Sequence, residues 1–248
     1  MKTSNKLLLG LLVVILIIAT TGIVVMKVWA EKSGLQLSGV TVTQEKQIDE
    51  FSELNLAGGI IVYFTQSDQT SLSLTGDSVL VANVRIEQNG SKLNIKLEEN
   101  TGHRNRVDVF IHNPKLSYLD VVAGAHFQTE NSLQGNIMKM EAIAGGKISM
   151  TGDFNVLDAN VTAGGMVNLT GNAERARFGG TAGGQIDALE FTSQFCKVNV
   201  VAGAIAEVYA SQELRVSANA GGIVKYKGNP KLTDIDISSG GRLNDLDD

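Results

Sequence analysis

The chain has one cysteine, Cys196, among its 248 residues. A single cysteine excludes an intramolecular disulfide and a zinc site built from several cysteines. Aromatic residues make up only 5% of the chain, which makes a glycan partner less expected than a protein partner. The formal net charge is -5, whereas a nucleic-acid partner would require basic patches. Stability must therefore come from the stacking of backbone and apolar side chains.

Histidine is also scarce and shows no metal-ligand pattern. His103, His112 and His126 lack a spacing such as two histidines four residues apart on a helix, so we expect surface histidines. Cys196 has no histidine near it in the sequence, and we expect a small buried or half-buried thiol rather than a nucleophile. The sequence thus gives no catalytic, cofactor or metal site.

An apolar run extends from Leu7 to Met26. A membrane crossing needs roughly 20 apolar residues, whereas a cleaved secretory signal has only about 7 to 15. We therefore expect a retained anchor, although Val28-Trp29-Ala30 resembles a cleavage site and leaves cleavage open. Lys2 and Lys6 precede the run, which predicts a cytoplasmic N-terminus in a single-pass inner-membrane protein. The rest of the chain would then lie in the periplasm or at the cell surface.

The tripeptide Ala-Gly-Gly, or a close variant, recurs in the second half of the chain. Its copies begin at Ala123, Ala144, Ala163, Ala182, Ala202, Ala220 and Ser239. Intervals of about 19 residues are typical of stacked repeats. We interpret the central glycines as structural corners: Gly124, Gly145, Gly164, Gly183, Gly203, Gly221 and Gly240. Such a corner costs other residues about 1 kcal/mol or more, and we expect the small alanine to let it pack closely.

Residues around each corner alternate between apolar and polar, which is typical of strands. Four residues before the first corner residue stand Leu119, Met140, Ala159, Phe178, Val198, Val216 and Ile235. Four residues after it stand Phe127, Ile148, Val167, Ile186, Ala206, Val224 and Leu243. Because the phase is constant, equivalent strands would stack in register and align these side chains as interior ladders. The prediction is an all-β parallel β-solenoid (β-helix) with rungs of about 19 residues, preceded by one N-terminal transmembrane helix.

The pattern divides the chain into four segments. We expect a cytoplasmic tip and transmembrane signal-anchor at 1–30, a spacer at 31–44, a β-rich N-terminal part or cap at 45–118, and regular repeats at 119–248. Within the cap, Gly58-Gly59 resembles a first corner, and Asn89-Gly90 predicts a two-residue hairpin. A cap is expected because a terminal rung otherwise exposes apolar surface and strand edges.

Several short motifs occur in a distinctive order after Glu45. They are Phe51 with Leu54-Asn55-Leu56-Ala57-Gly58-Gly59, the Gly76-Asp77 turn after Leu72 to Thr75, Lys92-Leu93-Asn94-Ile95, and Asn113-Pro114-Lys115-Leu116 leading into Val121-Val122-Ala123-Gly124-Ala125. In this order they resemble the bacterial head GIN domain family, also called auto-transporter adhesin head domains. The resemblance implies an exported β-helical domain, often tethered behind a signal or membrane anchor. The family has no assigned biochemical role and no established functional residues to transfer.

The outward positions provide the only candidate site. A polar ladder through Asp120, Glu141, Asn160, Asn199 and Asp236 is the predicted recognition face. Asp120 and Glu141 would stand on adjacent rungs, about 4.8 Å apart, and are the best candidate carboxylate pair for a glycosidase. However, no cationic or aromatic platform accompanies them, so we expect a solvated face.

Two ligand loops are disfavoured. A phosphate-cradling loop needs a strand-loop-helix unit, and no helical periodicity follows any corner. Calcium-binding solenoids carry Gly-Gly-x-Gly-x-Asp, and that pattern is missing here.

We therefore expect a membrane-anchored extracytoplasmic β-helical domain that binds, adheres or scaffolds at the bacterial cell envelope, without catalysis. Its partner would be an envelope protein or a glycan, besides the membrane through the N-terminal helix, and no nucleic acid or cofactor is expected. The alternative is a carbohydrate-active enzyme, a polysaccharide lyase or hydrolase, on a β-helix. A purely structural or signalling accessory of the envelope also stays open.

Overall fold

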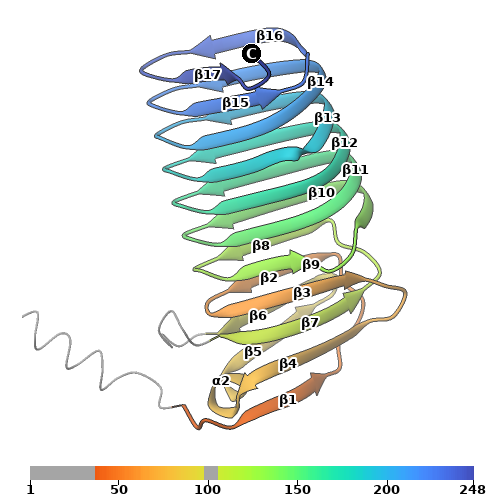
Figure 1. The fold of residues 1–248 in the computed structure, drawn as a ribbon. Helices are drawn as coiled ribbons and strands as arrows, with labels where there is room; N and C mark the ends of the chain where they lie inside the picture. The colour runs from red at the N-terminus through yellow and green to blue at the C-terminus, as the bar shows by residue number, and fades with distance from the viewer. Residues whose placement is uncertain (1–36, 98–105) are drawn as a thin grey trace, which may run out of the picture. The chain divides into compact units, whose positions relative to one another are not determined.

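The computed structural model describes residues 37–97 and 106–248, which form one unit built almost entirely of strands (Figure 1). The predicted membrane anchor and His103 lie outside the described residues. Within them, the α-helix is the short α2, Ser78–Ala82. None of the helices in the described ranges has the length and apolar character needed to cross a membrane.

The regular part of the fold is a stack of parallel strands. It comprises β8 (Tyr118–Val122), β9 (His126–Thr129), β10 (Leu133–Ile143), β11 (Lys147–Thr162), β12 (Met166–Thr181), β13 (Gln185–Val200), β14 (Ile205–Ala218), β15 (Ile223–Lys227), β16 (Lys231–Ile237) and β17 (Arg242–Asp245). Each strand pairs with its equivalent in the next repeat, as β11 does with β10 and β12. The predicted β-solenoid, with rungs of about 19 residues, is confirmed.

The interior ladders are present in the predicted register. Met140 lies opposite Leu119 and Ala159, and Val167 lies opposite Ile148 and Ile186. These six side chains are buried, and each full burial of a large apolar side chain contributes about 1.5–3 kcal/mol. Repetition of one buried environment thus replaces a conventional globular core.

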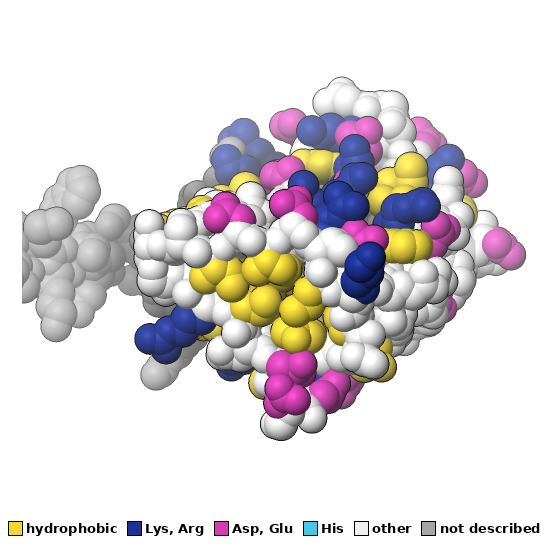
Figure 2. Space-filling model, turned by 90° about the horizontal axis from the view of Figure 1, so that it is seen from above, with side chains coloured by type: hydrophobic (Ala, Val, Ile, Leu, Met, Phe, Trp, Pro, Cys, Tyr) yellow, Lys and Arg dark blue, Asp and Glu magenta, His cyan; other side chains and the backbone are white. Residues whose placement is uncertain are grey.

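The last rung is different because no further described rung covers it. Ile235, which the pattern placed inside, and Ile237, two residues later on the same strand face, are each 41% exposed. Figure 2 looks onto this end of the stack and shows hydrophobic side chains gathered there beside acidic ones. The apolar sequence pattern therefore continues to the last rung, but the apolar side chains of that rung are not buried.

Each of the seven repeat corners is a two-residue turn in which the first residue, alanine or in the last corner serine, and the following glycine both have positive φ. At one of them, Ala163 has φ 51° and Gly164 has φ 73°, and the Gly165 nitrogen donates to the Thr162 oxygen at 3.1 Å. This is a type I′ turn. The alanine is exposed rather than closely packed, contrary to expectation. The close approach occurs at Gly165 instead, where a Cβ would lie 2.0 Å from the Ala142 oxygen.

A second bend lies in the middle of each long strand, on the side of the solenoid away from the corner (Figure 1), and no glycine or proline recurs there from rung to rung. In β11, burial alternates up to Phe154, after which both Asn155 and Val156 point outward and the phase changes. The Asn155 side chain donates to the Asn136 side chain at 2.7 Å. Two successive outward residues thus turn the strand from one face of the solenoid to the other.

The N-terminal part contains β1 (Thr41–Lys46), β2 (Glu53–Ala57), β3 (Ile60–Gln66), β4 (Ser71–Asp77), β5 (Val84–Asn89), β6 (Lys92–Leu97) and β7 (Val107–Asn113). The hairpin between β5 and β6 is confirmed, with Gly90 at φ 58°. β2 pairs with both β6 and β8, and β3 with both β7 and β9. The first rung of the chain therefore lies between a later rung and the regular stack.

Antiparallel strands close this end of the stack. β4 pairs with β7, and β1 pairs with β4. β1 begins at Thr41, within the segment expected to be a spacer. Among the described strands at this end, β1 pairs only with β4 and β5 only with β6, so each of these two antiparallel strands has one open edge.

Candidate recognition groove

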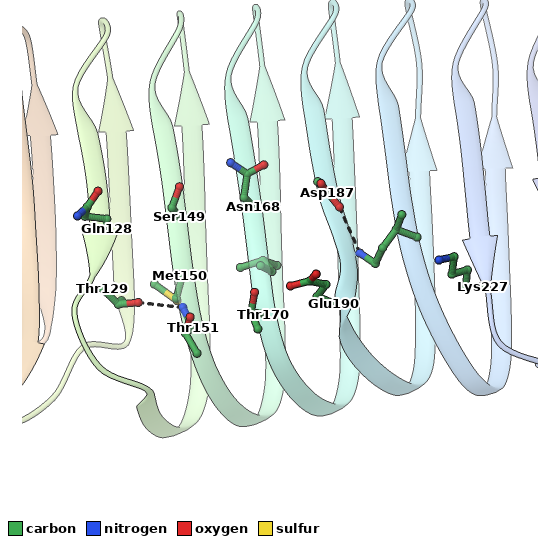
Figure 3. Close-up of a pocket in the computed structure, with 12 residues that line it drawn as sticks. Gln128, Thr129, Ser149, Met150, Thr151, Asn168, Thr170, Asp187, Glu190 and Lys227 are labelled. Atoms are coloured by element: carbon green, nitrogen blue, oxygen red, sulfur yellow. Dashed lines mark hydrogen bonds between the residues drawn. The ribbon is translucent and has the colours of Figure 1, made fainter. Parts of the chain in front are cut away.

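A groove of about 650 Å³ crosses neighbouring rungs on the face formed by the strand segments that follow the corners (Figure 3). One row of its lining is Gln128, Ser149, Asn168 and Asp187, each opposite the next. A second row is Thr151, Thr170 and Glu190. Stacked rungs repeat such groups about every 4.8 Å. The groove therefore offers regularly spaced hydrogen-bonding groups along the solenoid axis.

A bulge in β13 shapes one end of the groove. Ala188 lies opposite Val208, but the next pair is Thr192 with Tyr209, so residues 189–191 have no partner on β14. Phe191 turns inward and is 1% exposed, opposite Gly171. Its two predecessors, Leu189 and Glu190, are displaced toward the groove. The buried phenyl ring thus holds the groove's end in place.

The groove is polar and mostly uncharged. The Thr151 nitrogen donates to Thr129 Oγ1 at 2.9 Å, which fixes one hydroxyl. Charge is confined to the end at Asp187, Glu190 and Lys227. Hydroxyl and amide groups both donate and accept, so the groove can bind an extended polar ligand. The described residues contain no group of three or more His, Cys, Asp or Glu suited to a metal ion.

The predicted recognition face lies on the other strand segments, those that precede the corners. Its positions form one continuous ladder: Asp120, Glu141, Asn160, Gly179, Asn199, Ser217 and Asp236. The ladder continues into the N-terminal part, where Asp120 lies opposite Asn55 and the Asn55 side chain donates to Asn94 at 2.8 Å. The structure thus places all five predicted residues on one ladder, one per rung, and outside the groove.

Asp120 and Glu141, the candidate carboxylate pair, lie opposite each other on neighbouring parallel strands. Burial raises the pKa of Asp120, and the charge of Glu141 raises it further. Asp120 Oδ1 is buried and has no hydrogen-bond partner among the described residues. The two carboxyl groups lie side by side in one ladder, whereas glycosidase carboxylates flank the scissile bond. This geometry can perturb stability but does not surround a substrate.

Comparison with known proteins identifies the family of this chain. The family model described as "Putative auto-transporter adhesin, head GIN domain" matches residues 50–230. The chain belongs to the head GIN domain family. No protein with a curated description matches the sequence.

Solved structures share the head GIN fold. A putative adhesin from Bacteroides fragilis NCTC 9343 is 21% identical with TM-score 0.79, covering 86% of this chain and 100% of that one. A putative lipid binding protein from Parabacteroides distasonis ATCC 8503 is 21% identical with TM-score 0.69, covering 86% and 99%. A putative adhesin from Parabacteroides merdae ATCC 43184 is 18% identical with TM-score 0.67, covering 86% and 99%. At these identities the likeness establishes the fold.

Sequence reasoning did not identify the groove of this head GIN domain. Its first row occupies the fifth position after each corner alanine, an outward position as polar as the predicted ladder. The bulge left one signal: the spacing from Ala182 to Ala202 is one residue longer than the preceding spacing. That extra residue is what carries Leu189 and Glu190 to the groove.

Proposed function

We propose that this chain is a binding domain of the adhesin type that holds an extended partner in the recognition groove. An N-terminal membrane helix would place the solenoid outside the cytoplasm, and the domain would act without catalysis. The observation that carries the proposal is the double row of hydrogen-bonding side chains along the groove. Membership of the head GIN family and the fold shared with putative adhesins support it.

The partner proposed for the groove is an extended protein segment. The lining has no aromatic side chain on which a sugar ring could stack. It has amides and hydroxyls, such as Gln128, Asn168 and Thr170, which can exchange hydrogen bonds with a partner's backbone. Repetition across parallel rungs suits a ligand that is itself extended and repetitive.

A binding panel tests this function. The purified full chain would be measured by biolayer interferometry against immobilised fibronectin, collagen and mucin, and on a glycan array. Saturable binding to a protein is the expected result. The proposed binding function is contradicted when neither the immobilised proteins nor the glycan array gives saturable binding. Saturable binding to neutral glycans alone overturns the proposal that the partner is a protein.

The proposed topology has a separate test. External protease added to intact spheroplasts should degrade the solenoid, while a cytoplasmic control protein survives. Full protection of the chain, alongside digestion of an exposed control, would contradict the placement outside the cytoplasm.

The stacked pair Asp120 and Glu141 is the observation that favours an enzyme as second candidate. The test is release of reducing ends from polysaccharides by the full chain and by the double variant Asp120→Asn with Glu141→Asn. Activity abolished in the variant would establish the enzyme. Absent activity, or activity unchanged in the variant, excludes this pair.

A further inference from the structure

Three cationic side chains stand on successive rungs, on the face formed by the strand segments that precede the corners. Lys197 lies opposite Arg177 on one side and Arg215 on the other; we name these three residues the cation ladder. Parallel strands bring such side chains within about 4.8 Å of each other, and like charges in opposed positions destabilise a sheet. The chain as a whole carries a net charge of -5. The cation ladder is therefore a local concentration of charge with an electrostatic cost.

The cation ladder lines a hollow of about 370 Å³ together with Arg175, Phe195 and Glu213. The Arg175 guanidinium carbon lies 5.7 Å from the centre of the Phe195 ring, within the range of a cation–π interaction. The side chains of Arg177 and Arg215 are 62% and 53% exposed. The hollow thus presents accessible cationic groups, one of which is held on an aromatic ring.

Carboxylates at the edge hold the arginines without neutralising the centre. Arg177 contacts Asp158 at 3.4 Å and Arg215 contacts Glu213 at 2.7 Å, each through one nitrogen. A guanidinium has five N–H donors, so each retains donors for a ligand. Lys197, between them, makes no ion pair with any residue that the structure describes.

We infer that the cation ladder binds the anionic group of an acidic glycan, such as a uronic acid carboxylate or a sugar sulfate. The planar forks of Arg177 and Arg215 match carboxylate and sulfate oxygens, and Lys197 adds a point charge between them. Three cations in line along the solenoid axis suit a chain polymer with an acidic group on successive sugars.

The edge carboxylates also select against denser anions. Glu213 lines the hollow, and Asp158 pairs with Arg177, which also lines it. Both carboxylates would repel a nucleic acid or an anionic bilayer, which present many closely spaced phosphates. Separate acidic groups on a glycan can enter the hollow without crowding these carboxylates. The site shares no residue with the recognition groove, so it goes beyond the proposed function.

The test is calorimetric titration of the full chain with polygalacturonate, with chondroitin sulfate as the sulfated probe, and with neutral dextran. We expect saturable binding to at least one acidic glycan and none to dextran. Affinity should fall as salt rises from about 0.05 M to about 0.5 M, because exposed charges are screened. Absence of saturable acidic-glycan binding at the lower salt overturns the inference, as does binding that salt does not weaken.

Matched variants locate the site. Lys197→Gln should weaken acidic-glycan binding about tenfold, the loss expected for one charge-assisted hydrogen bond. Lys139→Gln makes the same change at the equivalent strand position two rungs before Arg177 and should alter affinity by less than about twofold. Circular dichroism should show both variants folded, since both lysines are exposed. Equal losses would contradict the assignment.

Two further outcomes would overturn the assignment of acidic-glycan binding to the cation ladder. A preference of the chain for anionic over zwitterionic phospholipid vesicles that Lys197→Gln abolishes would replace the glycan by a membrane. Loss of glycan binding in the groove variant Asn168→Leu with Thr170→Val would move the glycan into the groove. Retained glycan affinity in that variant supports a separate site, whatever happens to protein binding.

Discussion

A Cβ atom on Gly180 would lie 3.0 Å from the methyl carbon of Ala204 in the next rung. At the corner position of Ala204, five other rungs carry glycine and the first carries Ala125: the glycines are Gly146, Gly165, Gly184, Gly222 and Gly241. A Cβ on Gly165, for example, would lie 2.0 Å from the Ala142 carbonyl oxygen. The rung with Ala204 is thus relieved by a glycine in the rung before it. Gly180 and Ala204 therefore compensate for each other.

The first prediction is a double-mutant cycle on this pair. Gly180→Ala should destabilise the fold by about 1–3 kcal/mol, because the added methyl overpacks the interior. Ala204→Gly should cost about 0.5–1 kcal/mol through backbone entropy. The double variant should lose less than the sum, since the new methyl occupies the vacated space. Additive losses in urea unfolding would show that the two residues share no space.

The second prediction concerns the exposed corner residue Ala163. Its φ of 51° is a left-handed conformation, which asparagine tolerates better than alanine. Ala163→Asn should therefore raise the free energy of unfolding by about 0.5–1 kcal/mol. Ala163→Val, a β-branched residue at the same φ, should lower it. Urea unfolding in which valine stabilises as much as asparagine would refute the left-handed assignment.

The third prediction concerns the thiol of Cys196. The side chain is 3% exposed, and burial raises its pKa to about 12. Since thiolate is the reactive form, iodoacetamide near pH 8 should leave the native chain unmodified and alkylate the urea-unfolded chain. Mass spectrometry gives the two rates directly. Alkylation of the native chain as fast as the unfolded one would mean that Cys196 is accessible, contrary to its burial.

The fourth prediction is a pH dependence at Asp120. Its raised pKa means that the folded chain binds this proton more tightly than the unfolded chain does, so the ionised carboxylate destabilises the fold above that pKa. Asp120→Asn should raise the melting temperature near pH 7, and the gain should shrink toward pH 4 as Asp120 protonates. As a control, Asn160→Asp places a new charge opposite Glu141 and should destabilise by up to about 1 kcal/mol. A gain from Asp120→Asn that grows on acidification would contradict the sign.

The interior of the solenoid was predictable because one short pattern recurs in every rung. Val167 could be placed between Ile148 and Ile186 from spacing alone, and the structure has it there. The order of the N-terminal rungs was not predictable. β2 has the same alternating pattern wherever it stacks, and nothing local in its sequence specifies β6 and β8 as its neighbours.

The groove escaped prediction for a different reason. Its polar rows resemble any solvated strand face, and its shape depends on how Phe191 turns inward opposite Gly171. That packing choice appears in the sequence only as one extra residue between two corners. The polar ladder, by contrast, could be placed from the sequence, because its positions follow from the period-two alternation and the repeat alone. Its residues are Asp120, Glu141, Asn160, Asn199 and Asp236.

The most direct measurement compares two matched double variants in binding to the protein partner found on the panel. Asn168→Leu with Thr170→Val removes hydrogen-bonding groups from the groove at nearly constant shape. Asn160→Leu with Thr162→Val makes the same changes on the opposite face. The groove variant should lose at least about tenfold in affinity while the other variant keeps it. Unchanged binding by the groove variant, or a loss confined to the other one, would contradict recognition through the groove.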